Sequence, residues 1–378
     1  MKNTINYADG SLPGVKKFLE ARISFQQQIL DLTSLRSVQG LARKLLDCTP
    51  KIDVIILNAG MGGWIGIDWG NAIYAILTDI VQSMTWPKFK HSASGGTTKP
   101  QLLQNETSED PEPKLGEVFC ANVFGHYLLS HYLTPLLARS DTGRIIWVSS
   151  LEAYSSAFSM NDFQGIFSPL AYESSKRMTD VLALTSGLPA TTPWVNTYFS
   201  RNTAKDVDDK SSWTHSLRVR RPKMYVSHPG ICATSIFPLP LVLSILFIVA
   251  LYITRWLGSM WHTCTAYSGA CAPVWLALSP QSMLDQLEES EGPGKWGSAI
   301  DQMGNERVER TEVEGWGYGG VVGDVNLKKA RRKGRMRGVE EVTKETRDDF
   351  FALGRNCWRE LERLRVEWEK RLALVENQ

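Results

Sequence analysis

The chain has 378 residues, of which 43% are hydrophobic, and its formal net charge is +2. This length is sufficient for one large α/β domain with a tail, and the nearly neutral charge provides no field that would steer nucleic acid to the surface. The six cysteines are widely spaced and form no C-x-x-C pair, which argues against a metal site and against a disulfide scaffold. The first residues lack the apolar stretch of a secretory signal, so we expect a domain that faces the cytosol.

The first part of the chain shows the alternation of helix and strand that is typical of α/β proteins. Residues 11–23 predict the end of a helix, and residues 23–32 predict a strand that ends at Asp31. Residues 34–47 repeat apolar side chains at helical spacing. The apolar run 54–57 is typical of a parallel strand that is buried on both faces. Helix followed by buried strand predicts a βαβ arrangement.

The same alternation returns after a polar interruption. Residues 92–117 are rich in Ser, Gly, Thr, Pro and acidic residues, which predicts an exposed insertion. Helices are then expected over 118–137 and 171–184, and strands over 143–150 and 223–227. The expected fold is a Rossmann-like, doubly wound parallel sheet that lacks its first βα units, with a helical C-terminal tail.

We expect the domain to comprise residues 1–280 and an extension to follow over 281–378. Residues 281–325 are Gly-rich and are expected to be irregular. Seven of the ten residues from 328 to 337 are basic, which fits either a solvated linker or attraction to an anionic membrane surface. The amphipathic pattern of residues 350–372 predicts a helix that packs on the sheet or on a partner.

One segment, residues 236–257, predicts association with a membrane. No charged residue occurs from 232 to 254, and Arg255, Trp256 and Trp261 follow, which are residue types that settle at headgroup depth. A helix over 241–253 would extend about 20 Å, less than the roughly 30 Å of the hydrocarbon core. We therefore favour a helix in the plane of the interface over a full span, and a buried core helix is the competing interpretation.

The strongest chemical signal is the pair Tyr172 and Lys176, separated by one helical turn. A free tyrosine is a weak acid near neutrality, but a neighbouring ammonium favours the phenolate and should lower its pKa toward the working range. Tyr172 could then pass a proton to a developing alkoxide.

Other motifs accompany this pair in a fixed order along the chain. They are Asn58-Ala59-Gly60 after one predicted strand, Asn122 in a predicted helix, Ser149-Ser150 after the next strand, and Pro229-Gly230 after the last. Strands of open parallel sheets present their ligand sites at the carboxyl edge. The complete set, in this order, resembles the short-chain dehydrogenase/reductase superfamily.

The resemblance implies a role for each catalytic position. Tyr172 would donate the proton to the carbonyl, and Lys176 would lower its pKa and bind the nicotinamide ribose. Ser150, in preference to Ser149, would hold the substrate oxygen, and Asn122 would support a water-mediated proton relay to Lys176.

The resemblance also implies how the cofactor NADP(H) would bind. Asp31 matches the position that contacts adenine, and Asn58, Ala59 and Gly60 would flank the adenosine ribose. Pro229 and Thr234 match the loop that closes over the nicotinamide, where Tyr172 and Lys176 also lie.

Three longer segments, residues 57–64, 147–153 and 314–320, are similar to those of fungal 3-keto-steroid reductases. This resemblance implies NADPH-dependent reduction of a 3-keto sterol to the 3β-alcohol, within C-4 demethylation in ergosterol biosynthesis. We expect the reductase at the endoplasmic reticulum membrane or the lipid droplet surface, with the other enzymes of that demethylation as candidate partners.

The sequence departs from the superfamily at one point, because no T-G-x-x-x-G-x-G turn precedes Asp31. We expect either that the reading frame begins further upstream or that the chain is an inactive fragment. A non-catalytic membrane-associated interaction protein and a reductase for another hydrophobic ketone are the alternative functions.

Overall fold

The computed structural model describes residues 17, 22–102, 112–200, 221–234, 236, 239–323 and 334–376, with side chains described as far as residue 373. The chain divides into two compact units, Met1–Leu30 and Asp31–Gln378. In the first unit, residues 23–30 have no regular secondary structure, so the strand expected over 23–32 is wrong. A strand requires a hydrogen-bonded neighbour, and these residues pair with no strand of the described chain. The helix expected over 11–23 lies mostly outside the described residues.

The second unit is built on a five-stranded sheet with the order β1-β4-β5-β6-β7. Its strands are β1 Val54–Leu57, β4 Arg144–Val148, β5 Lys223–His228, β6 Lys295–Ile300 and β7 Glu306–Thr311. The first four run parallel, and β7 pairs antiparallel with β6. The expected α/β fold class is thus confirmed.

Strand β1 lies at the edge of this sheet, because among the described residues it pairs only with β4. The side chain of Ile56 is 41% exposed, and only Leu57 of this strand is buried. The expectation that 54–57 is buried on both faces is therefore wrong. An edge strand has a neighbouring strand on one side only. Its other side is therefore not covered by a further strand or by the helices that would pack on that strand.

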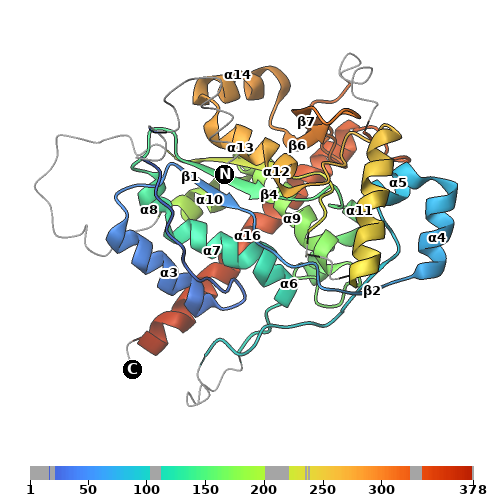
Figure 1. The fold of residues 1–378 in the computed structure, drawn as a ribbon. Helices are drawn as coiled ribbons and strands as arrows, with labels where there is room; N and C mark the ends of the chain where they lie inside the picture. The colour runs from blue at the N-terminus through green and yellow to red at the C-terminus, as the bar shows by residue number, and fades with distance from the viewer. Residues whose placement is uncertain are drawn as a thin grey trace, which may run out of the picture. The chain divides into compact units, whose positions relative to one another are not determined.

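Helices cover both faces of the sheet (Figure 1). The helices of the second unit are α3 Leu35–Cys48, α4 Trp69–Thr78, α5 Ile80–Thr85, α6 Glu117–Phe119, α7 Gly125–Tyr132, α8 Thr134–Leu137, α9 Ala171–Thr185, α10 Thr192–Phe199, α11 Leu241–Trp256, α12 Ala266–Gly269, α13 Cys271–Leu278, α14 Gln281–Glu291 and α16 Lys344–Glu376. Ile146 and Tyr225 pack with Leu276 of α13 and Leu284 of α14. Since successive strand side chains alternate, Trp147 faces the opposite layer, where its ring lies 6.3 Å from that of His126 on α7.

One region expected to be irregular contributes to the fold. Residues 281–325, predicted to be irregular, include α14, β6 and β7, so the sheet continues past the expected boundary at residue 280. No continuous apolar run marks these strands, because β6 mixes Trp, Ala and Ile with Lys, Gly and Ser, and β7 has one apolar residue among four charged ones. The basic run 328–337 lies mostly outside the described residues.

The expected insertion at 92–117 is only partly exposed. Residues 93–97 are exposed, residues 103–111 lie outside the described residues, and Gln101 and Leu115 are buried. The Gln101 side chain accepts a hydrogen bond from the Leu35 backbone N–H at 2.7 Å and donates to the Thr33 carbonyl at 3.1 Å. These bonds attach the segment to the start of α3. A two-stranded antiparallel sheet, β2 Trp64–Ile67 with β3 Lys90–Ser92, precedes it.

The helix expected over 350–372 is confirmed as part of the C-terminal helix α16, but α16 packs against the helices α9 and α10 and not on the sheet as expected. The crossing with α9 is close, because a Cβ at Gly354 would lie 2.5 Å from the Thr185 side chain. The Trp358 indole N–H donates to the Leu182 carbonyl of α9 at 3.2 Å. Helix α16 is therefore part of the core that supports α9.

We predict that Gly354→Ala lowers the free energy of unfolding by about 1–3 kcal/mol, because the added methyl group overpacks the crossing. The matched control is Gly40→Ala in α3, where a Cβ would meet nothing within 4 Å. That change should raise the free energy of unfolding by about 0.5–1 kcal/mol through helix propensity. Urea denaturation of both variants measures the difference, and equal effects would contradict a tight crossing.

Candidate active site

The predicted site residues begin at one edge of the sheet. Strands β1, β4 and β5 are parallel neighbours, so their carboxyl ends meet at the same edge. Asn58 follows β1, Ser149 follows β4, and Pro229 follows β5. The tertiary structure therefore brings together three motifs that are far apart in the sequence.

Helix α9 places Tyr172 and Lys176 over this edge, and every residue of the helix is buried. The Lys176 ammonium Nζ donates to the Val148 carbonyl, the last of β4, at 2.9 Å. It lies 5.6 Å from the centroid of the Tyr172 ring. Lys176 thus joins α9 to the end of β4 beside the phenol.

The two serines after β4 have different surroundings. Ser149 is buried, and its hydroxyl donates to the Lys176 carbonyl at 3.2 Å. Ser150 forms a side-chain hydrogen bond with Tyr172. Of the two hydroxyls, that of Ser150 is therefore the one placed beside the phenol.

Asn122 lies in a π-helical turn, Cys120–Phe124, between α6 and α7. Such turns are rare and occur frequently at functional sites. The Asn122 amide accepts from the Met61 N–H at 2.8 Å and donates to the Met61 carbonyl at 3.0 Å and to Ser175 Oγ at 2.9 Å. A Cβ at Gly60 would lie 2.6 Å from Asn122 Oδ1, so this approach requires glycine. Asn122 thereby attaches the loop after β1 to α9.

The electrostatics of Tyr172 differ from the expectation. Burial raises the pKa of the Tyr172 phenol well above its ordinary value, and the charges of Glu152 and Glu173 raise it further, while the hydrogen bond with Ser150 lowers it. The prediction that Lys176 brings this pKa toward neutrality is not met, because burial and the two carboxylates outweigh any lowering.

Two other buried bases have lowered pKa values. Burial lowers the pKa of Lys176 to about 8, and the nearby Lys295 lowers it too, while Asp180 opposes the change. Burial also lowers the pKa of His126 to about 4, so its imidazole is neutral near pH 7. His126 Nε2 lies 2.7 Å from the Ala59 carbonyl and supports the loop after β1.

The residues expected to bind the cofactor lie in different surroundings, and within the described chain some of them have no bond to the site around Tyr172. Asn58, Ala59 and Gly60 are exposed at the sheet edge. The Asp31 carboxylate accepts from the backbone N–H and hydroxyl of Thr33 at 2.9 and 2.7 Å, which orders the entry to α3. The Pro229 carbonyl accepts from the Thr263 hydroxyl at 2.9 Å, and Thr234 is exposed. Within the described residues, no hydrogen bond or ion pair joins Asp31 or Thr234 to Tyr172.

Four residues beside Tyr172 were not predicted from the sequence: Trp64, Lys90, Glu152 and Glu173. The Trp64 ring packs edge-to-face on Tyr172 with centroids 4.8 Å apart. Lys90 forms buried ion pairs with Glu152 and Glu173. Glu152 and Glu173 adjoin predicted motifs, but no spacing along the chain relates them to Lys90.

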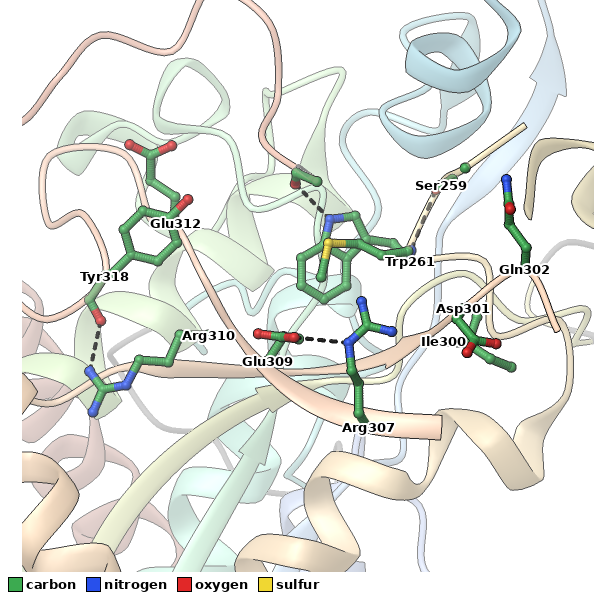
Figure 2. Close-up of a pocket in the computed structure, with 13 residues that line it drawn as sticks. Ser259, Trp261, Ile300, Asp301, Gln302, Arg307, Glu309, Arg310, Glu312 and Tyr318 are labelled. Carbon is green, nitrogen blue, oxygen red and sulfur yellow. Dashed lines mark hydrogen bonds and ion pairs between the residues drawn. The ribbon is translucent and has the colours of Figure 1, made fainter. Parts of the chain in front are cut away.

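A separate pocket of about 330 Å³ lies near the ends of β6 and β7 (Figure 2). Its lining is polar and includes the ion pair of Arg307 with Glu309 at 2.8 Å. None of the predicted site residues lines it. Trp261 forms one wall, and its indole N–H donates to the Gly334 carbonyl at 2.6 Å.

Comparison with known proteins identifies close relatives. The chain is 46% identical to the 3-keto-steroid reductase of Aspergillus fumigatus over 95% of this chain and 80% of that protein. It is 42% identical to the one of Gibberella zeae over 86% and 68%, and 30% identical to the one of Schizosaccharomyces pombe over 79% and 74%. The chain belongs to the 3-keto-steroid reductase family. No protein-family model matches it.

Similar solved structures include a short-chain dehydrogenase of Salmonella enterica, which is 20% identical and aligns over 61% of this chain and 68% of that one with a TM-score of 0.31. The family of this chain rests on the sequence relatives, and its fold on the order of its own strands.

We predict that Asn122→Ala lowers the free energy of unfolding of the protein by about 1–3 kcal/mol, because it leaves the polar groups of Met61 and Ser175 without this partner. The control is Asn71→Ala, which removes an exposed bond to Asp68 and should change the free energy by less than about 0.5 kcal/mol. Urea denaturation measures both. An equally small effect for Asn122 would show that its amide does not hold the loop.

Proposed function

We propose that the chain reduces the 3-keto group of a sterol to the 3β-hydroxyl group with NADPH. The observation that carries this proposal is the Tyr172 phenol, hydrogen-bonded to Ser150 and one helical turn from Lys176 at the carboxyl edge of the sheet. The relatives of the chain, named 3-keto-steroid reductases, support the same reaction.

In this proposal, the chain's own residues bind the carbonyl oxygen and supply its proton. The Ser150 hydroxyl orients the oxygen, and the Tyr172 hydroxyl donates the proton as negative charge develops there. The raised pKa of Tyr172 keeps the phenol protonated at neutral pH, as a donor must be. Lys176, held by the Val148 carbonyl, places a positive charge beside the reacting oxygen.

The residues at the sheet edge fit the ribose-bearing half of a nicotinamide cofactor. Asn58, Ala59 and Gly60 are exposed there, and a Cβ at Gly60 would lie 3.9 Å from Lys176 Nζ, which leaves the ammonium facing a glycine. When bound, the cofactor would supply the hydride. The choice of NADPH comes from the family resemblance.

An apolar cluster next to Ser150 supports a hydrophobic substrate. It comprises Trp86, Leu151, Tyr154, Ala157, Trp261 and Ala299. Leu151 directly follows Ser150, so this cluster adjoins the proposed oxygen-binding hydroxyl. These side chains are at most 8% exposed, so the cluster provides apolar surroundings for Ser150, and the sterol itself is inferred from the names of the relatives.

We predict that Tyr172→Phe lowers the rate of 3-keto sterol reduction by about 10²–10⁴-fold, the usual loss on removing a general acid. Tyr267→Phe, at a residue that is 65% exposed on α12, is the control and should retain activity. NADPH oxidation with a 3-keto sterol measures both, with circular dichroism to verify the fold. Near-normal turnover of Tyr172→Phe would refute the proposed mechanism, and faster turnover of a non-steroid ketone would indicate another substrate.

We further propose that α11 and α4 attach the reductase to a membrane, such as the surface of the endoplasmic reticulum or a lipid droplet. Only Leu251 and Thr254 of α11 are buried, which argues against a buried core helix. Ile76 of α4 and Phe247 of α11 pack in one apolar cluster, so the two helices are held together (Figure 1).

Both helices carry large apolar side chains on their outward faces. These side chains include Trp69, Ile73, Tyr74 and Leu77 of α4 and Leu241, Val242, Ile245, Leu246, Val249 and Trp256 of α11, each at least 48% exposed. Among the described residues, no helix is both long and apolar enough to cross a membrane. These faces therefore suit an interfacial position, with their Trp and Tyr side chains at headgroup depth.

We predict that Leu77→Glu and Leu246→Glu each reduce flotation of the protein with vesicles of phosphatidylcholine and phosphatidylserine. Inserting a charged side chain into the membrane interface costs free energy, whereas inserting a leucine does not. The control is Leu278→Glu on α13, a leucine that is 80% exposed outside these faces. Flotation unchanged by both substitutions, or reduced equally by the control, would contradict the proposal.

A further inference from the structure

A buried cation lies between two buried carboxylates beside Tyr172. Lys90 of β3 forms a short ion pair with Glu152 and lies 3.4 Å from Glu173, measured from Nζ to Oε1. The side chains of Lys90, Glu152 and Glu173 are 10%, 9% and 2% exposed. Charged groups this deeply buried are rare unless they are paired.

This cluster is linked both to Tyr172, through the ring of Trp64, and to Ser150. Lys90 Nζ lies 3.9 Å from the Trp64 ring centroid, and the Trp64 ring packs edge-to-face on Tyr172. The backbone N–H of Glu152 donates to Ser150 Oγ at 3.2 Å. The cluster thus holds the ring of Tyr172 on one side and its hydroxyl partner on the other.

The charges of the cluster do not balance when both carboxyls are ionised, because one ammonium faces two carboxylates. Burial raises the pKa of Glu152 to about 7, Lys90 opposes this rise, and the charge of Glu173 adds to it. The groups that face Glu152 are Lys90 from β3, Glu173 and Tyr172 from α9, and Tyr154 from the turn after β4. Glu152 is therefore the member that changes charge near neutral pH.

We propose that Lys90, Glu152 and Glu173 form a positioning cluster for Tyr172, in which the charge on Glu152 controls how tightly the phenol holds its proton. An ionised Glu152 disfavours the phenolate, so the proton is held more tightly above about pH 7 and released more readily below it. The inference rests on the proposed role of Tyr172 as proton donor.

The test observes the phenol and requires no turnover. The eleven tyrosines are labelled with ¹³C at Cζ, and the Tyr172 signal is assigned from its loss in Tyr172→Phe. In the wild-type protein, this signal should shift with a midpoint near pH 7 as Glu152 ionises. In Glu152→Gln, which removes the charge of Glu152 from the cluster, the step near pH 7 should disappear. The titration of Lys176, whose pKa is lowered to about 8 and whose Nζ lies 5.6 Å from the Tyr172 ring centroid, should remain as a separate step.

The control is Glu309→Gln, an exposed carboxyl that is paired with Arg307 on β7 and should leave the shift unchanged. No step near pH 7 in the wild type, or the same step in Glu152→Gln, would overturn the proposal. If Glu152→Gln does not fold, Lys90→Arg provides a second test. This substitution keeps the positive charge but changes its distance from Glu152, so the midpoint of the Tyr172 shift should move. An unchanged midpoint would also overturn the proposal. Because no sterol or cofactor is added, failure here is distinguishable from failure of the proposed reduction.

Discussion

The hydrogen bond from the Lys176 ammonium to the Val148 carbonyl joins α9 to the sheet, and the geometry of the site depends on it. It sets the register between the helix that carries Tyr172 and the strand that precedes Ser150. A second hydrogen bond, from the Ser149 hydroxyl after β4 to the Lys176 carbonyl of α9, supports the same register. The phenol and the Ser150 hydroxyl then meet without a contribution from any exposed loop.

This arrangement has an electrostatic cost, because α9 carries charged residues into the core. Lys295 of β6 forms a buried ion pair with Asp180 at 2.6 Å and donates to the Ser150 carbonyl at 2.5 Å. Buried pairs contribute little net stability but are strongly destabilising when one partner is removed. The role of this pair is therefore better described as holding Ser150 in place than as stabilising the fold, and Lys90 has the corresponding role toward Glu152.

The helices outside the sheet divide into two groups with different physical tasks. Helix α16 covers α9 with fully buried side chains such as Trp358 and Trp368. Helices α4 and α11 instead leave large apolar side chains in contact with solvent, as at Leu77 and Leu241. Exposed apolar side chains on two helices that pack against one apolar cluster are the basis of the proposed membrane attachment.

Local sequence patterns are enough to locate the motifs and most of the parallel strands. The Y-x-x-x-K spacing placed Tyr172 and Lys176 on one helix, and the apolar runs 54–57 and 143–150 predicted β1 and β4, because helical and strand periodicities are local properties. The uncharged run before Arg255 likewise predicted an apolar helix. Local patterns failed for residues 23–32 and 281–325, because a strand forms only where a neighbour offers hydrogen bonds, and the sequence does not state which segments are neighbours.

The surroundings of the Tyr172 phenol depend on how separate elements pack together. Lys90, Glu152 and Glu173 come from a short antiparallel sheet, a turn and a helix, and their spacing along the chain carries no signal. The pKa of Tyr172 likewise depends on burial and on charges that are close only in space. Motif spacing reports contacts within one element, whereas Coulomb interactions and desolvation depend on distances between elements, which packing alone sets.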